Sequence, residues 1–160
     1  MSTKHILLAE DDPSHVALFR RAMKSSGIDC DLDVVNDGVE AIDYLFATGE
    51  FRDRDARQVP DLILLDLRMP KMDGLQVLQV MRRVRGNERM RWPPVIVLTS
   101  SDLGEDIADA YRWGAQSYIR KPISYEEFTQ TVHETLRYWL GLNRPVPVYR
   151  GAAGLVHEGI

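Results

Sequence analysis

Short apolar runs alternate with segments of helical spacing along most of this chain. The runs lie at residues 6–9, 32–35, 62–65, 95–98 and 117–119, with turn or capping residues beside each one. After each run, apolar residues recur every three or four positions, in the sets Val16, Phe19 and Met23; Val39, Ile42 and Phe46; Val77, Leu78, Met81 and Val84; Ile107, Ala110 and Tyr111; and Phe128, Val132, Leu136 and Trp139. The pattern predicts five strands, each followed by an amphipathic helix.

Residues suited to helix starts precede four of the five helices. Asp12 comes directly before Pro13, which suits the first helical position. Each of Asp37, Asp102 and Ser124 has a glutamate three residues later, which is the spacing of a capping box. We therefore expect helices to begin just after these positions.

The composition of the third and fourth runs indicates how the strands are arranged. Residues 62–65 and 95–98 are almost wholly apolar, as strands covered on both faces of a parallel sheet must be. Right-handed crossovers then place helices on both sides of the sheet. The sequence predicts a doubly wound α/β fold.

Two stretches interrupt the alternation. Residues 49–60 are charged and rich in turn formers, which favours a surface excursion, and the mixed charges at 52–55 indicate a solvated loop rather than a docking site. After Trp139, the prolines at 145 and 147 favour extended backbone and an end to the helix. We expect one domain over residues 1–140 and an extension over 141–160, either a tail or an arm that crosses a dimer.

Length and charge narrow the function classes. The 160 residues allow one domain with a full core, and 44% hydrophobic with 28% charged residues is the balance of a soluble globular protein. No run could span a membrane and no signal peptide opens the chain, so we expect a cytoplasmic protein. Cys30 is the single cysteine, which excludes disulfides and cysteine-rich zinc sites. The net charge of −4 forms no basic stripe, so nucleic acid is not an expected partner.

Candidate chemistry lies directly after the apolar runs, because ligands of open α/β sheets bind outside the carboxyl ends of the strands. The residues found there are Glu10, Asp11 and Asp12 after the first run, Asp66 after the third, Thr99, Ser100 and Ser101 at the end of the fourth, and Arg120, Lys121 and Pro122 after the fifth. Carboxylates, a hydroxyl and an ammonium should therefore meet at one edge of the sheet.

Such a set suits phosphoryl transfer. Crowded carboxylates would take up protons unless a cation held them ionised, and Mg²⁺ prefers oxygen ligands of this kind. Asp66 could then attack phosphorus, with the Thr99 hydroxyl and the Lys121 ammonium neutralising charge on the phosphoryl oxygens. The expected product is an acyl phosphate on Asp66.

These residues resemble the signature of response-regulator receiver domains. The likeness rests on the Glu10-Asp11 pair, on residues 66–74, on Thr99-Ser100 and on Lys121-Pro122, and it covers roughly residues 4–139. It implies a flavodoxin-like five-stranded parallel sheet in the order 2-1-3-4-5 with five helices. It also implies a partner histidine kinase and a protein that accepts a phosphoryl group rather than an enzyme, and that has no output domain of its own.

The resemblance further implies a role for each matched position. Asp66 would be the phosphorylated residue, with Thr99 and Lys121 binding the phosphoryl group and Tyr118 turning inward as the switch aromatic when the Thr99 hydroxyl moves. The cation, Mg²⁺ or Mn²⁺, would be bound directly by Asp11 and Asp66 and by the Arg68 carbonyl, and by Glu10 through water. Ser100 stands where a smaller residue is usual, and Arg68 could place a cation over the phosphoryl group.

A narrower likeness concerns residues 46–51, 118–122 and 138–145. They resemble the receivers that serve bacterial and cyanobacterial phytochrome histidine kinases, a subgroup known for homodimers built on the last strand and helix with a C-terminal extension. The resemblance implies a phytochrome kinase as partner and a homodimer. Its expected dimer or partner surface is an exposed apolar strip, formed by Tyr138, Trp139, Leu140 and Leu142.

Simpler interpretations exist for single residues. Asp11 and Asp12 could merely cap the first helix, and Tyr118 could be ordinary core packing. The histidines have no metal-ligand spacing and no adjacent nucleophile, so surface positions are expected for His5, His15, His133 and His157.

Other functions are compatible with the same topology. A phosphatase with a nucleophilic aspartate would want a second carboxylate where this chain has Arg68, and a flavin phosphate site would be repelled by the acidic residues 10–12. A receiver fold that acts as a constitutive binding or dimerisation module, with an intact but unused site, is a further alternative.

Overall fold

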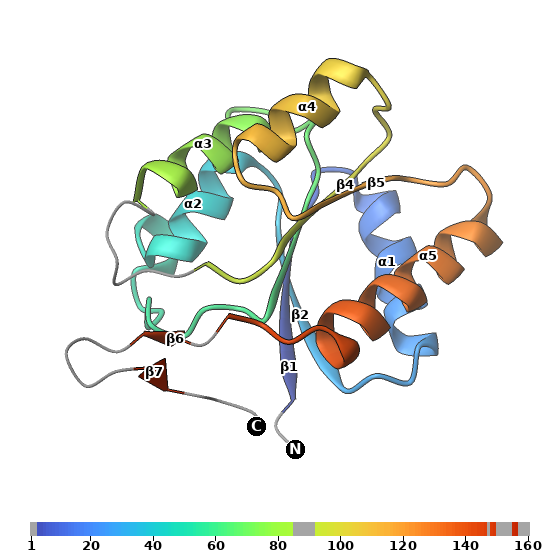
Figure 1. Ribbon diagram of the computed structural model, residues 1–160, viewed down its shortest axis with the longest axis horizontal. Coiled ribbons are helices and arrows are strands. Elements are labelled where there is room, and N and C mark those ends of the chain that lie inside the picture. The colour runs from blue at the N-terminus through green and yellow to red at the C-terminus, as the bar shows by residue number, and fades with distance from the viewer. Residues whose placement is uncertain (1–2, 85–91, 147, 150–154, 157–160) are drawn as a thin grey trace.

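Five parallel strands form the central sheet of this protein in a computed structural model that describes residues 3–84, 92–146, 148–149 and 155–156 (Figure 1). The strands lie in the order β2-β1-β3-β4-β5. Their bounds are β1 Lys4–Ala9, β2 Cys30–Val35, β3 Leu62–Leu65, β4 Val95–Thr99 and β5 Ser117–Arg120. All five predicted strands and the predicted strand order are confirmed.

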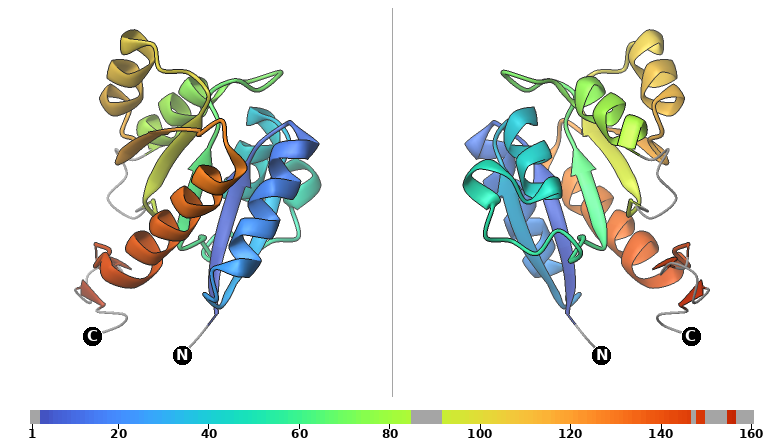
Figure 2. Two further views of the ribbon diagram at one scale, coloured as in Figure 1. Left: turned by 90° about the vertical axis from the view of Figure 1, so that its right-hand side faces the viewer. Right: turned by 90° about the vertical axis from the view of Figure 1, so that its left-hand side faces the viewer.

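The five predicted helices are also present, and they cover both faces of the sheet. They are α1 Pro13–Ser25, α2 Gly38–Phe46, α3 Gly74–Val84, α4 Gly104–Arg112 and α5 Tyr125–Arg137. Helices α1 and α5 lie side by side on one face, and α2, α3 and α4 lie on the other (Figures 1 and 2). Among the described residues, none of the helices has the length and apolar character needed to cross a bilayer.

The third strand explains why both faces need a helical layer. All four residues of β3 are at most 1% exposed, and they alternate between the two faces. Ile63 and Leu65 join the core under α2 and α3, whereas Leu62 and Leu64 join the core under α1 and α5. Asp66 is the first residue after this wholly apolar strand, so it lies at the carboxyl end of the sheet.

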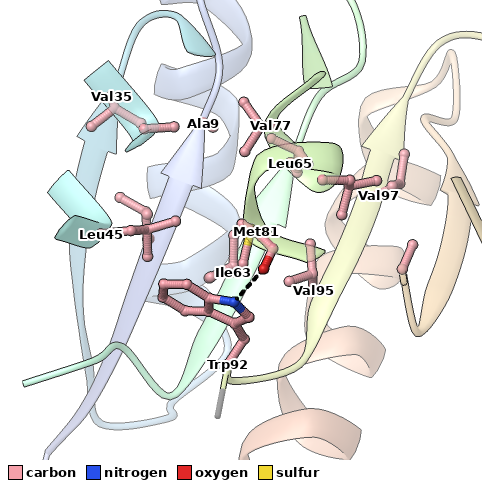
Figure 3. Close-up of a cluster of buried hydrophobic side chains, with 14 of the residues drawn as sticks. Ala9, Val35, Leu45, Ile63, Leu65, Val77, Met81, Trp92, Val95 and Val97 are labelled. Carbon is pink, nitrogen blue, oxygen red and sulfur yellow. Dashed lines mark hydrogen bonds between the residues drawn. The ribbon is translucent and has the colours of Figure 1, made fainter. Parts of the chain in front are cut away.

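Trp92 fills the core between α3 and the sheet (Figure 3). Its indole Nε1 donates a hydrogen bond to the Met81 carbonyl oxygen at 2.9 Å, which satisfies the buried N–H group. Its ring meets the Phe46 ring edge-on, with centroids 5.4 Å apart. This packing ties α2 and α3 to the segment that leads into β4.

Of the predicted helix starts, the one at Asp12 is confirmed and the one at Asp102 is not. Asp12 caps α1 by accepting from the Ser14 N–H group at 2.8 Å, as predicted. The prediction for Asp102 is wrong, because Leu103 precedes α4 without a side-chain cap. Asp102 instead places a carboxylate oxygen 3.1 Å from Arg120 Nη1, since the end of β5 lies within its reach.

The predicted apolar faces of α2 and α4 are partly wrong. In α2 the buried residues include Tyr44 and Leu45, whereas Val39 is 41% exposed. In α4 they are Asp106 and Ala110, and Tyr111 is 49% exposed. The spacing therefore identified both helices correctly but placed their buried faces about one residue out of phase, and in α4 it missed a buried carboxylate.

The charged stretch after α2 is anchored to the protein more firmly than the sequence indicated. A 3-10 turn, η1 Gly49–Phe51, places the Phe51 ring 5.3 Å from the Tyr44 ring. The Arg54 guanidinium lies 3.9 Å from the centre of the same Tyr44 ring. Arg54 is thus part of the fold, because it stacks on an aromatic ring and also donates to the carbonyls of Tyr44 and Gln58.

The chain after α5 departs from the predicted helix end. Helical winding continues beyond Trp139 as a π-helical turn, η2 Tyr138–Leu142, and the backbone becomes extended at Asn143. An antiparallel pair that the sequence did not predict follows, formed by β6 Val148–Tyr149 and β7 Leu155–Val156. This pair lies at the end of the molecule opposite the carboxyl ends of the five strands (Figure 2). The rest of the predicted arm or tail lies outside the described residues.

We expect the start of α3 to tolerate no side chain. A Cβ atom added to Gly74 would lie 2.4 Å from the Asp66 carbonyl oxygen, so Gly74→Ala should lower the free energy of unfolding by about 1–3 kcal/mol in urea titrations. Gly104 opens α4 in the same way but has nothing within 4 Å of the added atom. Gly104→Ala should therefore raise stability by about 0.4–1 kcal/mol. Equal effects of the two substitutions would contradict this account.

Candidate functional site

The strand order brings four of the predicted site residues together. Strands β1 and β4 flank β3, so Glu10 and Thr99 lie on either side of Asp66, and Lys121 reaches across from the end of β5. The Thr99 hydroxyl donates to Asp66 Oδ1 at 2.9 Å, and Lys121 Nζ donates to Asp66 Oδ2 at 2.7 Å. Lys121 Nζ also donates to Glu10 Oε1. One ammonium thus joins two carboxylates from neighbouring strands.

Burial makes this arrangement electrostatically demanding. Glu10 is 2% exposed and Asp66 is 7% exposed, and the Lys121 side chain is 8% exposed. Two carboxylates in such a place need a cation, because isolated buried charges are strongly unfavourable. Lys121 supplies it, and burial that would lower the pKa of its ammonium is outweighed by Asp66 and Glu10, which raise that pKa.

The pKa values of the two carboxyl groups are shifted in opposite directions. Burial raises the pKa of Glu10, and the charge of Asp66 adds to that effect despite the hydrogen bond from Lys121. Burial acts in the same direction on Asp66, but the bonds from Lys121, the Arg68 N–H group and the Thr99 hydroxyl together hold its pKa below the ordinary value. The ionised form of Asp66 is therefore favoured, and this is the form a nucleophile needs.

His15 belongs to the same cluster, although the sequence indicated a surface position. Its Nδ1 atom lies 3.1 Å from Glu10 Oε1 and 3.0 Å from Lys121 Nζ, and its side chain is 38% exposed. Ligand atoms of Glu10, His15 and Asp66 all lie within 4.8 Å of one another. The signal for His15 was its place in the first turn of α1, since that turn begins at the edge where the strands end.

Asp11 is placed differently from its neighbour. Its side chain is exposed and lies outside the compact set of possible ligand groups formed by Glu10, His15 and Asp66. Arg68 has its backbone N–H group 3.0 Å from Asp66 Oδ1, so the loop after β3 folds back onto the strand end. The ligand roles predicted for Asp11 and for the Arg68 carbonyl remain predictions.

A second group of polar contacts surrounds the loop after β4. Arg68 Nη2 donates to Asp106 Oδ2 at 2.7 Å, and the Ser101 hydroxyl donates to the same oxygen at 2.6 Å. The Tyr118 hydroxyl donates to the Ser101 carbonyl at 2.8 Å. We call Arg68, Asp106, Ser101 and Tyr118 the Asp106 network. The sequence singled out Arg68 and Tyr118 but missed Asp106 and the contact role of Ser101, because apolar spacing does not reveal a buried carboxylate.

Tyr118 packs in the core, and its role as switch aromatic stays a prediction. Its ring packs against the core under α2, α3 and α4, and burial raises the pKa of its phenol. Its hydroxyl is nevertheless bonded to the loop that follows Thr99. Packing and a contact to the site loop are both present.

The predicted apolar strip at the end of α5 is only partly exposed. Tyr138 is 48% and Leu142 is 66% exposed. Trp139 and Leu140 are instead partly buried against the core under α1 and α5. These two residues follow buried Leu136 by three and four positions, so they continue the inward face of α5.

Removing the Lys121 ammonium, which Glu10 and Asp66 share, should destabilise the protein strongly. Lys121→Met leaves Glu10 and Asp66 without their ammonium, and we expect the free energy of unfolding at pH 7 to fall by about 3–5 kcal/mol in urea titrations. Adding Glu10→Gln should recover part of this loss, because one buried charge is removed. The control is Lys24→Met on the exposed side of α1, which should cost less than about 1 kcal/mol. Similar losses for the two lysine variants would refute the role of Lys121.

Comparison with known proteins places these features in a wider group. A family model for the response regulator receiver domain matches residues 6–133. FilR2 of Methanothrix harundinacea, described as a probable methanogenesis regulatory protein, is 41% identical over 139 residues, which are 87% of this chain and 85% of FilR2.

Two solved structures are similar in both sequence and fold. The phosphorylated cyanobacterial phytochrome response regulator RcpA matches with a TM-score of 0.79 at 33% identity, covering 90% of this chain and 99% of RcpA. The Mn²⁺-bound form of response regulator Rcp1, a protein known from Synechocystis, matches with a TM-score of 0.78 at 31% identity, covering 89% of this chain and 99% of Rcp1.

Proposed function

Because this chain belongs to the response regulator receiver family, we propose that Asp66 accepts a phosphoryl group from a phosphohistidine of a sensor histidine kinase. The observation that carries the proposal is the set of contacts to Asp66: the Thr99 hydroxyl on one oxygen and the Lys121 ammonium on the other. A buried, ionised carboxylate held between a hydroxyl and an ammonium is the arrangement that phosphoryl transfer requires.

The transfer uses the chain's own residues in simple roles. An Asp66 carboxylate oxygen forms the new bond to phosphorus, while the bond from phosphorus to the donor imidazole nitrogen breaks and that nitrogen keeps the electron pair. The Thr99 hydroxyl and the Lys121 ammonium are placed to turn from the carboxylate to the phosphoryl oxygens, whose charge they neutralise. Subsequent hydrolysis of the acyl phosphate returns the protein to its starting state.

The donors present fit a hard divalent cation. The carboxylates of Glu10 and Asp66 contact the Lys121 ammonium, and Asp11 and Asp12 follow Glu10 directly in the chain, so negative charge is in excess at this end of the sheet. Asp11, Asp66 and the Arg68 carbonyl would hold Mg²⁺ or Mn²⁺, with Glu10 acting through water. Such an ion supplies charge neutralisation for the phosphoryl oxygens. The Mn²⁺-bound form of the similar protein Rcp1 supports this assignment.

The output of the site would run through Thr99 and Tyr118. Thr99 ends β4, and Tyr118 on the neighbouring strand β5 holds the loop that follows Thr99 through the Ser101 carbonyl. Movement of the Thr99 hydroxyl toward a phosphoryl group would therefore act directly on a loop to which Tyr118 is bonded. Added charge would in this way bias a two-state element.

A phytochrome histidine kinase is the proposed source of the phosphoryl group, and a homodimer is the proposed assembly. RcpA is a phytochrome response regulator by its description, which supports the first part. FilR2, by contrast, is described as a probable methanogenesis regulatory protein, and this description names no phytochrome. The exposed side chains of Tyr138 and Leu142 support the second part, because they leave apolar surface uncovered in the η2 turn directly after α5.

Acetyl phosphate provides a direct test of Asp66. Wild-type protein should gain one phosphoryl group in intact-mass spectra, and Asp66→Asn should gain none, because an amide oxygen is a poor nucleophile. Chelation with EDTA should abolish labelling, and Mg²⁺ or Mn²⁺ should restore it. The control is Asp53→Asn in the exposed loop after η1, which should label like wild type. Full labelling of Asp66→Asn would place the acceptor elsewhere.

Sedimentation equilibrium tests the proposed dimer. Leu142→Asp puts a charge on the exposed end of the strip and should weaken the dimer at least about tenfold without unfolding the monomer, since Leu142 is 66% exposed. Val39→Asp changes an apolar residue of α2 that is 41% exposed, and should leave the dimer unaffected. A wild-type protein that is monomeric at every concentration would rule out the dimer.

A further inference from the structure

Helix α4 buries a carboxylate that phosphoryl transfer itself does not use. Asp106 is 8% exposed and lies on the inward face of α4 beside Ala110. A single oxygen, Oδ2, receives both the Ser101 hydroxyl at 2.6 Å and Arg68 Nη2 at 2.7 Å. The first turn of α4 is therefore held in place by an ion pair, because a buried carboxylate without its cation would be strongly unfavourable.

The cation of this pair comes from the acceptor loop. Arg68 lies two residues after Asp66, and its backbone N–H group donates to Asp66 Oδ1 at 3.0 Å. Its side chain is 65% exposed, whereas the Asp106 side chain is 11% exposed. The exposed guanidinium can thus rotate to a new partner. The Asp106 carboxylate is buried, so it can reach solvent after losing Arg68 only if α4 moves.

The same carboxylate is joined to the switch residues. Ser101 donates its hydroxyl to Asp106 and accepts the Tyr118 hydroxyl at its carbonyl oxygen. Ser101 follows Thr99 by two residues, and Thr99 is bonded to Asp66. The Asp106 network therefore closes a continuous path from Asp66 through Arg68 to α4, and back through the loop after β4 to Thr99.

We infer that Asp106 and a phosphoryl group on Asp66 compete for Arg68, so that phosphorylation releases the first turn of α4. This inference rests on the proposed function of Asp66. Phosphorylation would replace the single negative charge of the Asp66 carboxylate by the roughly two of an acyl phosphate, beside the backbone of Arg68. Guanidinium groups bind phosphoryl oxygens strongly, often in a bidentate manner. When Arg68 turns to the phosphoryl group, Asp106 loses its cation, and α4 and the Ser101 loop lose their shared restraint.

Competition has a reciprocal consequence. If the phosphoryl group weakens the Arg68–Asp106 pair, the pair must weaken the hold of Arg68 on the phosphoryl group by the same factor. Asp106→Asn keeps the size of the side chain and an oxygen for Ser101, but it removes the charge that attracts Arg68. Arg68 should then remain on the phosphoryl group and exclude water from the acyl phosphate, which lengthens its lifetime.

The first experiment needs no phosphorylation. Hydrogen exchange of unphosphorylated protein should show faster exchange of the amides of residues 104–112 in Arg68→Ala than in wild type, by severalfold, because α4 has lost its restraint. The matched control is Asp102→Asn, which removes an exposed ion pair with Arg120 just before α4 and leaves Arg68 untouched. Exchange in α4 that is equal in wild type and Arg68→Ala would overturn the inference even if Asp66 is a phosphoryl acceptor.

The second experiment measures acyl phosphate lifetime after acetyl phosphate is removed. Asp106→Asn should lengthen the half-life severalfold in the wild-type background and have no effect in the Arg68→Ala background, whereas Asp102→Asn should have no effect in either. A lengthening of equal size in both backgrounds would show that Asp106 acts without Arg68, and would overturn the competition. Absence of any label on wild-type protein would instead reject the proposed function, while hydrogen exchange still decides whether Arg68 restrains α4.

Discussion

The ammonium of Lys121 is the contact on which the candidate site depends. Glu10 and Asp66 are buried at the ends of neighbouring strands, and their charges would repel each other without a cation between them. Lys121 directly follows β5, which lies two strands away from β3, so the site forms only when β3, β4 and β5 are correctly registered. Folding of the sheet and assembly of the site are therefore one event.

The contacts of Lys121 and Thr99 with Asp66 also favour phosphoryl transfer. The same hydrogen bonds that make buried Asp66 tolerable keep its pKa low, whereas burial and the charge of Asp66 raise the pKa of Glu10. Lys121 and Thr99 already point at the Asp66 carboxylate, so a phosphoryl group bound there would meet groups that are oriented in advance. Stability and reactivity thus rest on the same contacts.

Arg68 connects this cluster to the outer layer of the protein. Its backbone faces Asp66 and its side chain faces Asp106 on α4, and Ser101 and Tyr118 complete the same group of contacts. The Arg68 side chain is largely exposed while the Asp106 carboxylate is buried, so a change of charge at Asp66 reaches a helix that has little freedom to accommodate it locally. The inferred competition for Arg68 would give α4 a restrained state before phosphorylation and a released state after it.

The sequence by itself determined the alternation of strands and helices and the residues at the strand ends. Apolar runs such as residues 62–65 can be buried only in a sheet covered on both faces, and parallel strands bring their carboxyl ends to one edge, so Glu10, Asp66, Thr99 and Lys121 had to meet. Only the tertiary structure decided the place of His15 and the inward face of α4 with Asp106, because the rotation of a helix about its axis depends on close contacts with its neighbours. Sequence periodicity locates such a face to within about a residue, and one residue separates the exposed side of α4 from the carboxylate that holds it.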